Sequence, residues 1–504
     1  MTHTISDQLL LQCSEFITLR FGLHFPKKRW RDLERGLACA ARDLGFADAQ
    51  TCLRRLVATQ LTKEQTDALV GHLTIGETYF FRDKNCFEAL QAHIFPKLIE
   101  SRRGREQRLR IWCAGCSSGE EPYTVAILLH RMIADLAGWN ITILATDINP
   151  ASLRKGAHGE YGEWSFRDTP SWIKEQYFTT NSDGRRVISD AIMKMVTFAP
   201  LNLARDPFPA LANNTNAMDV IFCRNVLMYF VPEQIRGVID KFRHSLVEGG
   251  WLIVSPCETS HALFAGYSTV QLNNTIFYRK EDHEVKSSPA PLLQRGEILA
   301  PLCETAIKQG PPLAKGDSGG LPPAIANPVR DVPPVSLYDE ALLSYGRGEY
   351  AEAAAKLGAF LNNTQQDKTS PAFGEAAALL TRAYANQGNL SQALEWSEKA
   401  VAADRLNPRL YYLQATIFQE KGEDGAAVVS LKRAIYLDQG FVLAHFALAN
   451  LTLRRGKAKE AARHLENAAS LLLACGEDDI LPGAEGMSAR RLAEIVAATR
   501  EGLM

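Results

Sequence analysis

The sequence lacks several features that would place it in a specialised class of protein. It contains no run of about 18 or more uninterrupted apolar residues, so it predicts no membrane-spanning helix. Its ten cysteines are scattered, a pattern that favours a reducing compartment over a disulfide framework. The formal net charge of −1 gives no overall field that would attract nucleic acid or membrane, so electrostatic recognition has to be local.

The N-terminus also lacks a basic start followed by an apolar run, since residues 1–16 contain Asp7 and Glu15. We therefore expect no signal peptide and a cytoplasmic protein. With 504 residues, 46% hydrophobic and 22% charged, the composition is that of a soluble globular chain too long for one hydrophobic core. Roughly two to four domains are expected.

Residues 1–76 form a predicted helical N-terminal domain. Apolar residues recur there at three- and four-residue spacing, as at Leu9, Cys13 and Phe16. A basic run in this domain has two possible roles, a solvated helix face or a docking face for an acidic helical partner. The run consists of Lys27, Lys28, Arg29 and Arg31.

Residues 77–281 alternate short apolar runs with helical segments, which predicts a doubly wound α/β sheet. The expected buried strands are at 110–113, 141–145, 219–223 and 250–254, with helices at 123–135 and 232–246. An Asn-Ser-Asp-Gly turn at 181–184 predicts a hairpin, so we expect a small β subdomain at about 160–200.

Residues 282–335 are rich in proline, glycine and serine and are predicted to be a linker. Small residues then recur every 34 residues along the chain. The recurring positions are Gly388, Gly422 and Gly456, then Ala393, Ala427 and Ala461, then Ala400, Ala434 and Ala468. This period predicts tetratricopeptide repeats over 336–474, followed by a capping segment at 475–504.

The segment 112–123 passes from a predicted strand through small residues into a helix that begins near Pro122. The small residues allow a nucleotide-like ligand to approach the backbone closely. Glu120 and Glu121 would repel a pyrophosphate but could pair with an ammonium, such as the amino group of S-adenosylmethionine. Alternatively, the two acids only favour the helix N-terminus.

Asp147 ends the second predicted strand, some 30 residues after this loop. An acid at that place can accept hydrogen bonds from ribose hydroxyls. The alternative is a helix start, with Asn149 as the cap before Pro150. The residues alone leave both roles open.

Five segments, in this order, closely resemble motifs of the chemotaxis receptor methyltransferase (CheR) family, and the resemblance covers residues 5–280. They are Thr-Tyr-Phe-Phe-Arg at 78–82, the loop at 116–123, Ala-Thr-Asp-Ile at 145–148, Asn-Leu at 202–203, and Ile-Phe-Cys-Arg-Asn-Val-Leu-Met-Tyr-Phe at 221–230. The sequence departs from the family at Gly76, where a polar residue is frequent, and at 255–258, where Ser-Pro-Cys-Glu replaces Gly-His-Ser-Glu.

The resemblance implies a class I (Rossmann-like) methyltransferase domain with a helical N-terminal domain, and all-α repeats follow it here. It further implies a protein-glutamate O-methyltransferase that uses S-adenosyl-L-methionine, releases S-adenosyl-L-homocysteine and acts on the cytoplasmic helical bundle of chemoreceptors, recruited to receptor arrays. Matched to the family motifs, the cofactor-binding residues are Gly76, Thr78, Arg82, Glu121, Asp147, Asn202, Leu203, Arg224 and Asn225. Arg82 and Tyr229 match positions near the transferred methyl and are the implied catalytic residues.

The expected chemistry needs no general base, because a glutamate side chain, with a reference pKa of about 4.3, is ionised at neutral pH. Arg82 would hold cofactor or acceptor and Tyr229 would orient the acceptor carboxylate; their alternatives are a surface salt bridge and a buried core tyrosine. We expect no metal, because Cys113 and Cys116 form one pair without a second. A basic stretch that extends from Arg102 to Arg110 lacks interleaved aromatics, so we expect it to be solvated.

Two other functions compete with this hypothesis. The domain could be a scaffold that has lost turnover, or a methyltransferase with a small-molecule acceptor. We expect the repeats to bind an unidentified protein of the same signalling array, or to fold back and regulate the active site. As an independent module, their deletion (residues 336–504) is expected to leave S-adenosylmethionine binding nearly intact.

Overall fold

The computed structural model describes residues 5–59, 61–281, 336–363 and 370–501. Residues 1–281 and 337–504 belong to one compact unit. The linker predicted at 282–335 lies outside the described residues. None of the helices in the described ranges has both the length and the apolar character that crossing a bilayer requires.

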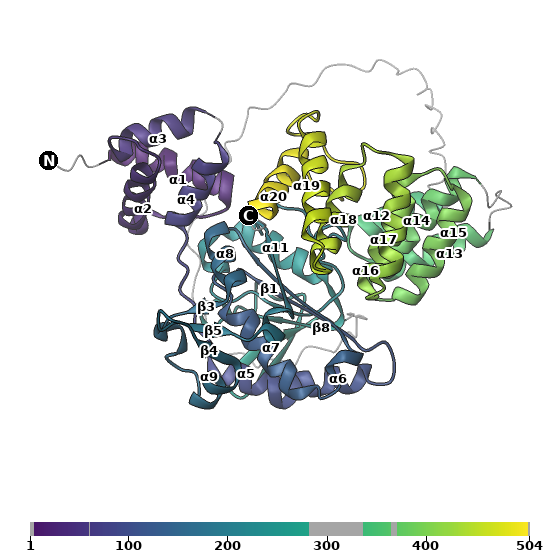
Figure 1. Cartoon of the computed structure of the whole chain (residues 1–504), viewed down its shortest axis with the longest axis horizontal. Coiled ribbons are helices and arrows are strands. Elements are labelled where there is room, and N and C mark those ends of the chain that lie inside the picture. Colours follow the sequence, from purple (N-terminus) through teal and green to yellow (C-terminus); the bar gives the residue numbers. More distant parts are fainter. Residues whose placement is uncertain (1–4, 60, 282–335, 364–369, 502–504) are drawn as a thin grey trace, which may run out of the picture. The chain divides into compact units, whose positions relative to one another are not determined.

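Four helices form the N-terminal bundle, purple in Figure 1. They are α1 (Asp7–Phe21), α2 (Trp30–Asp43), α3 (Ala49–Ala58) and α4 (Lys63–Leu73). The side chains of Ser6, Asp48 and Thr62 each accept a hydrogen bond from a backbone N–H of the first turn that follows, which fixes where α1, α3 and α4 begin. The apolar faces of the four helices share one core. The predicted helical N-terminus is therefore confirmed.

A seven-stranded sheet forms the next layer, in the order β6-β2-β1-β7-β8-β10-β9. Its strands are β1 (Arg108–Ala114), β2 (Asn140–Asp147), β6 (Val196–Pro200), β7 (Met218–Phe222), β8 (Leu246–Ile253), β9 (Ser268–Leu272) and β10 (Thr275–Arg279). The pairs among β6, β2, β1, β7 and β8 are parallel, whereas β10 is antiparallel to both neighbours. The strand order reverses between β1 and β7, which is where open α/β sheets bind ligands.

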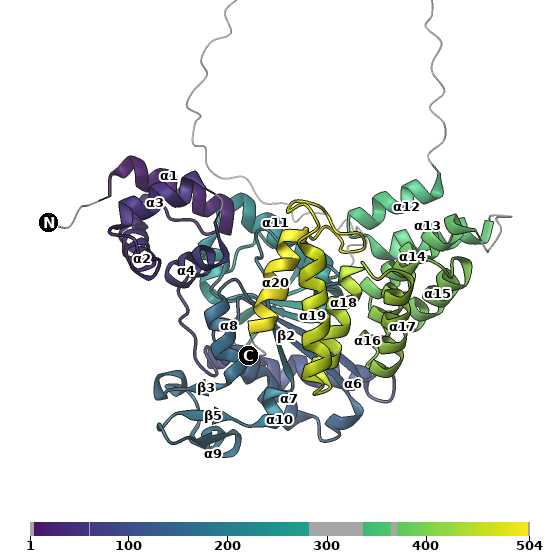
Figure 2. The ribbon, with the colours of Figure 1, turned by 45° about the horizontal axis from the view of Figure 1, so that its top comes forward.

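Helices accompany the sheet, and a small second sheet is inserted between β2 and β6. The helices are α5 (Lys84–Ala89), α6 (Phe95–Arg102), α7 (Glu120–Met132), α8 (Pro150–His158), α9 (Ser171–Tyr177), α10 (Asp190–Met193) and α11 (Pro232–Ser245). The second sheet pairs β3 (Glu160–Tyr161), β5 (Arg186–Ile188) and β4 (Phe178–Thr180) in antiparallel order. Figures 1 and 2 show β3, β5 and α9 together at one side of the domain.

The expectation of a solvated basic stretch from Arg102 to Arg110 is wrong for its last two arginines. Arg108 and Arg110 lie on β1 and are only 3% and 1% exposed. Arg110 Nη2 donates to Asn214 Oδ1 at 2.6 Å, and its backbone N–H donates to Asp219 Oδ2 at 2.8 Å. The partners in these two bonds are 104 and 109 residues away along the chain. A local sequence pattern cannot predict contacts at such separations.

The C-terminal region consists of paired antiparallel helices (Figure 2). They are α12 (Leu337–Gly346), α13 (Tyr350–Asn363), α14 (Pro371–Asn386), α15 (Leu390–Ala403), α16 (Pro408–Glu420), α17 (Asp424–Leu437), α18 (Val442–Arg454), α19 (Ala458–Leu472) and the capping helix α20 (Ala489–Glu501). The recurring glycines sit in the turns between paired helices with φ from +73° to +78°. Glycine is required there because other L-residues rarely adopt such angles.

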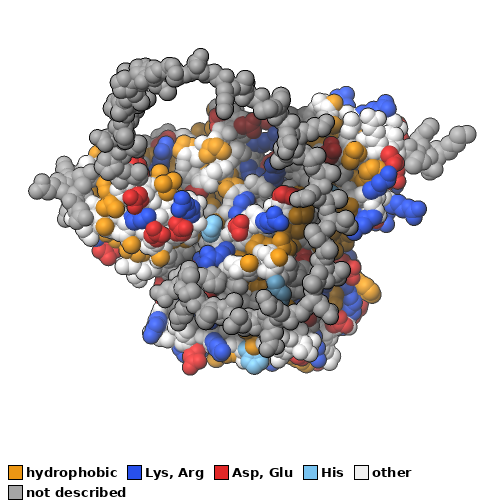
Figure 3. Space-filling model, turned by 180° about the vertical axis from the view of Figure 1, so that it is seen from behind, with side chains coloured by type: hydrophobic (Ala, Val, Ile, Leu, Met, Phe, Trp, Pro, Cys, Tyr) orange, Lys and Arg blue, Asp and Glu red, His pale blue; other side chains and the backbone are white. Residues whose placement is uncertain are grey.

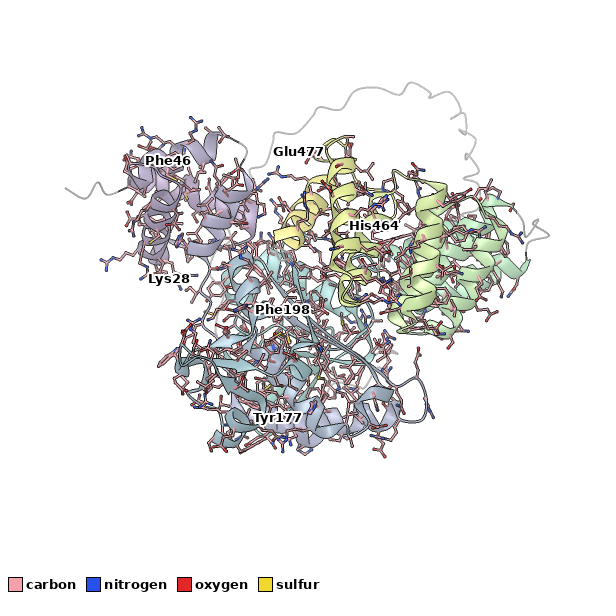
Figure 4. The ribbon with its side chains drawn as sticks, in the orientation of Figure 1. Lys28, Phe46, Tyr177, Phe198, His464 and Glu477 are labelled. Atoms are coloured by element: carbon pink, nitrogen blue, oxygen red, sulfur yellow. The ribbon has the colours of Figure 1, made fainter. Side chains whose placement is uncertain are left out.

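Side chains of both charges are interspersed on the surface seen in Figure 3, in keeping with the net charge of −1. The interior of the sheet domain is close-packed, and Phe198 of β6 lies within it (Figure 4). The ring of Phe198 packs on α8 at Gly156, where an added Cβ would lie 2.6 Å from the ring and 3.2 Å from the Ser118 carbonyl oxygen. Helix α8 can therefore approach the sheet closely only because residue 156 is glycine.

We predict that Gly156→Ala lowers stability and that Gly237→Ala, in the exposed part of α11, raises it. Both substitutions gain up to about 1 kcal/mol of helix propensity. Only the first overpacks the core, at a cost of about 1–3 kcal/mol, since nothing lies within 4 Å of a Cβ added at Gly237. Thermal unfolding of both full-length variants measures the difference. Equal midpoints would contradict the close packing of α8 on β6.

Candidate active site

A cleft with about 1130 Å³ of empty space, part of it open to solvent, lies at the carboxyl ends of the parallel strands. The N-terminal bundle supplies part of its wall, through Phe21, Phe25 and Arg29 among others. Every site residue predicted from the sequence lines this cleft. They are Gly76, Thr78, Arg82, Glu121, Asp147, Asn202, Leu203, Arg224, Asn225 and Tyr229. Those from Glu121 onward converge because the loops that follow parallel strands emerge at the same edge of the sheet. Gly76, Thr78 and Arg82 come instead from the segment between α4 and α5.

The loop after β1 shapes the floor of the cleft. Gly115 has φ +84°, and a Cβ there would lie 2.3 Å from Val226 Cγ2, so the loops after β1 and β7 touch at a position that only glycine can occupy. Ser117 adopts φ +49°, and its backbone N–H donates to Asp147 Oδ2 at 2.8 Å. The small residues of the predicted loop therefore serve close approach of backbone segments.

Asp147 is held from both sides at the end of β2. Its Oδ1 accepts from the Asn149 backbone N–H at 2.8 Å and its Oδ2 from that of Ser117. Burial raises the pKa of Asp147, while these hydrogen bonds lower it. Asn149 in turn caps α8, accepting from the Ala151 and Ser152 N–H groups. The helix start weighed for this segment is therefore confirmed, with Asn149 as its cap, and the ribose contact of Asp147 stays a prediction.

Of the two glutamates that begin α7, only Glu121 lines the cleft. Glu120 is 1% exposed and accepts hydrogen bonds from Ser118 Oγ at 2.8 Å and Ser165 Oγ at 3.0 Å. The expectation that both acids face a ligand ammonium is therefore wrong for Glu120, which ties the loop to the segment after β3. Burial raises the pKa of Glu121, and the neighbouring Arg224 lowers it.

Arg224, directly after β7, joins several parts of the site. Its Nη1 donates to Glu121 Oε2 at 3.1 Å, and its Nη2 donates to the Arg82 carbonyl at 2.8 Å. The same Nη2 lies 3.5 Å from Asp83 Oδ2, and the arginine side chain is only 4% exposed. This guanidinium therefore holds the 82–83 turn and the start of α7 together at the end of β7.

Arg82 and Tyr229, the predicted catalytic pair, both line the cleft. Arg82 Nη1 donates to the Glu77 carbonyl at 2.7 Å, so the surface salt bridge weighed from sequence is not what holds it. Tyr229 is half-buried, and the guanidinium carbon of Arg29 lies 5.3 Å from its ring centroid. The Tyr229 carbonyl accepts from the His24 N–H at 2.7 Å, which fastens the N-terminal bundle to this loop.

The structure shows what surrounds the two departures from the family pattern, Gly76 and the segment 255–258. A Cβ at Gly76 would lie 3.1 Å from Ser117 Oγ, whose hydroxyl donates to the Gly76 carbonyl. Glu258 is 8% exposed and accepts from the backbone N–H groups of Asn225 at 2.7 Å and Met228 at 3.3 Å. Glu258 therefore holds the loop 225–229 in place, despite the changed residues before it.

Sequence reasoning missed two contributors to the site. Arg29 belongs to the basic run at 27–31, of which Lys27, Lys28 and Arg31 are exposed. Arg29 is the member of this run that lines the cleft, and no local sequence signal separates it from its neighbours. Glu258 was noted only as part of a variant motif. The role of its carboxylate becomes evident only in the fold, where the segment after β8 lies beside the loop after β7 and Glu258 can accept from the backbone of that loop.

The cleft combines charged and apolar side chains. The half-buried Asp147 carboxylate, the apolar side chains of Leu203 and Phe230, and the ion pair of Glu121 with Arg224 all line it. Strand order, the small-residue loop and the acid after β2 together define a class I methyltransferase fold with a site for S-adenosylmethionine. No cluster of three or more His, Cys, Asp or Glu suited to a metal occurs within the described residues.

Comparison with known proteins identifies the family. The family described as "CheR methyltransferase, SAM binding domain" matches residues 76–271. The chemotaxis protein methyltransferase of Borreliella burgdorferi is 32% identical over 257 residues, which cover 51% of this chain and 89% of that protein. Chemotaxis protein methyltransferase 1 of Pseudomonas aeruginosa is 34% identical over 217 residues, covering 42% of this chain and 77% of the relative.

The chain therefore belongs to the CheR methyltransferase family, and is a protein-glutamate methyltransferase with S-adenosylmethionine as methyl donor. Among solved structures, MamA from Desulfovibrio magneticus is similar at 21% identity with a TM-score of 0.25, covering 27% of this chain and 75% of MamA. So low a score carries no argument about the repeats, whose assignment depends on their 34-residue period and their paired helices.

We predict that Glu258→Gln lowers methyl transfer and cofactor affinity by about ten-fold each. Loss of the charge weakens two charge-assisted hydrogen bonds to the loop that carries Asn225 and Tyr229. Glu248→Gln is the matched control, because that carboxylate is half exposed, lies 2.9 Å from the Lys280 ammonium and does not line the cleft. Calorimetry with S-adenosylhomocysteine gives the affinity. Equal effects of both substitutions would contradict a positioning role for Glu258.

Proposed function

We propose that the protein forms methyl esters on glutamate side chains in the cytoplasmic helical bundle of a chemoreceptor-type protein, within a chemosensory signalling pathway. The relatives named chemotaxis protein methyltransferases support this proposal. The observation that carries it is the cleft itself, where the half-buried Asp147 and the pair Arg82 and Tyr229 line one continuous space. The protein would work in the cytoplasm, recruited to receptor arrays.

S-adenosylmethionine supplies the chemistry: its sulfonium-bound methyl passes to a glutamate carboxylate oxygen, the C–O bond forming as the C–S bond breaks. The acceptor is already ionised, so the protein moves no proton. Its work is to align the two reactants and exclude water. Asp147 would accept hydrogen bonds from the ribose hydroxyls, and the apolar side chains of Leu203 and Phe230, which line the same cleft, would enclose the base.

Three cationic or hydroxyl groups would receive the acceptor carboxylate. Arg82, Tyr229 and Arg29 all line the cleft, and Arg29 lies against the Tyr229 ring. Burial raises the pKa of Tyr229, so its hydroxyl stays protonated at neutral pH and can donate to the acceptor. The exposed Lys27, Lys28 and Arg31 nearby in sequence provide positive charge for an acidic receptor helix.

The repeats would bind a protein partner of the same array through their second helices. Helix α17 exposes two large apolar side chains, Val429 at 68% and Tyr436 at 83%, and Leu473 after α19 is 89% exposed. Exposed apolar side chains gathered on one element are typical contact points for a partner.

Transfer of radiolabelled methyl from S-adenosylmethionine to receptor cytoplasmic fragments tests the proposal. We expect the label to reach the receptor and to be released as methanol by alkali, because carboxyl methyl esters are base-labile. Label that resists alkali would contradict ester formation. Tight cofactor binding without transfer to any receptor fragment would favour the scaffold alternative, and transfer to a small molecule would favour the third alternative.

Two substitutions separate the cofactor role from the acceptor role. Asp147→Asn should weaken S-adenosylhomocysteine binding by about 1.5–3 kcal/mol, on the order of ten- to hundred-fold, because a charged acceptor is lost. Asp240→Asn, on the exposed face of α11, is the control and should change nothing. Tyr229→Phe should leave cofactor affinity unchanged and lower kcat by about ten-fold or more. A Tyr229→Phe variant with normal kcat would remove Tyr229 from the acceptor site.

A further inference from the structure

The loop between β6 and β7 (residues 202–216) is held by the C-terminal repeats. Leu211 of this loop is 8% exposed and belongs to the apolar cluster of the repeats, together with Ala341 and Leu380. Its backbone N–H donates to Glu485 Oε2 at 2.7 Å, and Glu485 lies 3.6 Å from Arg382 of α14. Repeat arrays bind their ligands on an extended concave surface. Here the apolar cluster of the array includes a residue from another part of the same chain.

Buried charges fasten a second part of this contact. Glu420, at the end of α16, lies 3.5 Å from Arg108 and 3.8 Å from Arg110 on β1, and all three side chains are at most 4% exposed. The Glu420 carboxylate also accepts from Asn216 Nδ2 at 2.9 Å. Buried charges are stable only when paired, so these two arginines require the repeats as their partner. This requirement explains why they are not solvated.

The capping helix α20 reaches the turn that carries Asn202 and Leu203. Arg491 donates from Nε and Nη2 to Asp206 Oδ2, at 3.0 and 2.7 Å. The same oxygen accepts from the Asn202 backbone N–H at 2.7 Å. Asp206 and Asn202 are 7% and 8% exposed, so water competes little for these bonds. One carboxylate oxygen therefore joins the C-terminal helix to the wall of the cofactor cleft.

We propose that the repeats are an internal brace of the cofactor site, and that Arg491 is a positioning residue which acts through Asp206 on Asn202 and Leu203. This inference rests on the proposed cofactor cleft. It also replaces the expectation of an independent module, because the repeats hold both the β6–β7 loop and the buried end of β1. A partner that moves α20 would thereby change cofactor affinity without touching the cleft.

The test uses the full chain and two neighbouring arginines on α20. Arg491→Gln removes the positive charge that pairs with Asp206, whereas Arg490→Gln removes a neighbouring arginine whose ion pairs are with Glu477 and Glu494. We expect Arg491→Gln to weaken S-adenosylhomocysteine binding in calorimetry on the order of ten-fold, a typical size for coupling between sites. Arg490→Gln should bind like the wild type, and Arg491→Lys should recover part of the affinity.

Asp206→Asn alone keeps the proposal testable if Arg491→Gln folds poorly, since Asp206→Asn leaves the repeats unchanged and retains an oxygen for Asn202. Where both variants fold, they form a double-mutant cycle. We expect the two substitutions together to weaken binding no more than either alone. Additive losses, or an Arg491→Gln affinity equal to the wild type, would overturn the brace. If the wild type methylates a receptor and Arg491→Gln binds S-adenosylhomocysteine as tightly as the wild type, the brace is rejected and the proposed function is retained. If the wild type binds S-adenosylhomocysteine but methylates no receptor, only the proposed function is rejected.

Discussion

The active site depends on one buried guanidinium. Arg224, 4% exposed in its side chain, pairs with Glu121 and with Asp83 and donates to the Arg82 carbonyl. Through these bonds it joins the end of β7, the start of α7 and the turn that carries Arg82. An arginine suits this place because its planar group can serve several acceptors at once and stays charged when buried. Without it, Glu121, whose side chain is 14% exposed, would lose its cationic partner, and the 82–83 turn would no longer be tied to the start of α7.

Three carboxylates around the cleft, buried or half-buried, each hold a loop in place. Asp147 fixes the loop after β1, Glu258 fixes the loop after β7, and Asp206 fixes the turn after β6. Each accepts backbone N–H groups from a loop that would otherwise be free to move, which is the preorganisation that an alignment-driven methyl transfer requires. Asp206 differs from the other two because its second partner, Arg491, comes from the far end of the chain. The proposed coupling between repeats and cofactor site follows from that single difference.

Much of this arrangement can be predicted from the sequence because it follows from local rules. Gly115, Asp147 and Arg224 lie at or just after the ends of β1, β2 and β7, which brings them to one edge of a parallel sheet. A 34-residue period of small residues defines the helix pairs. What cannot be predicted depends on partners far along the chain. Glu120 and Glu121 are indistinguishable until Ser165 takes the first and Arg224 the second. Arg29 looks like Lys28 until the N-terminal bundle closes on Tyr229, and Arg108 looks solvated until Glu420 covers it.

A crystal structure of the full chain with S-adenosylhomocysteine tests the central claim most directly, that these loop-end residues form one cofactor and acceptor site. The account predicts the ribose hydroxyls on the Asp147 carboxylate, the sulfur directed toward Tyr229 and Arg82, and the Asp206–Arg491 pair intact beside Asn202. A ligand whose sulfur faces away from Tyr229 and Arg82, or whose ribose lies away from Asp147, would contradict it.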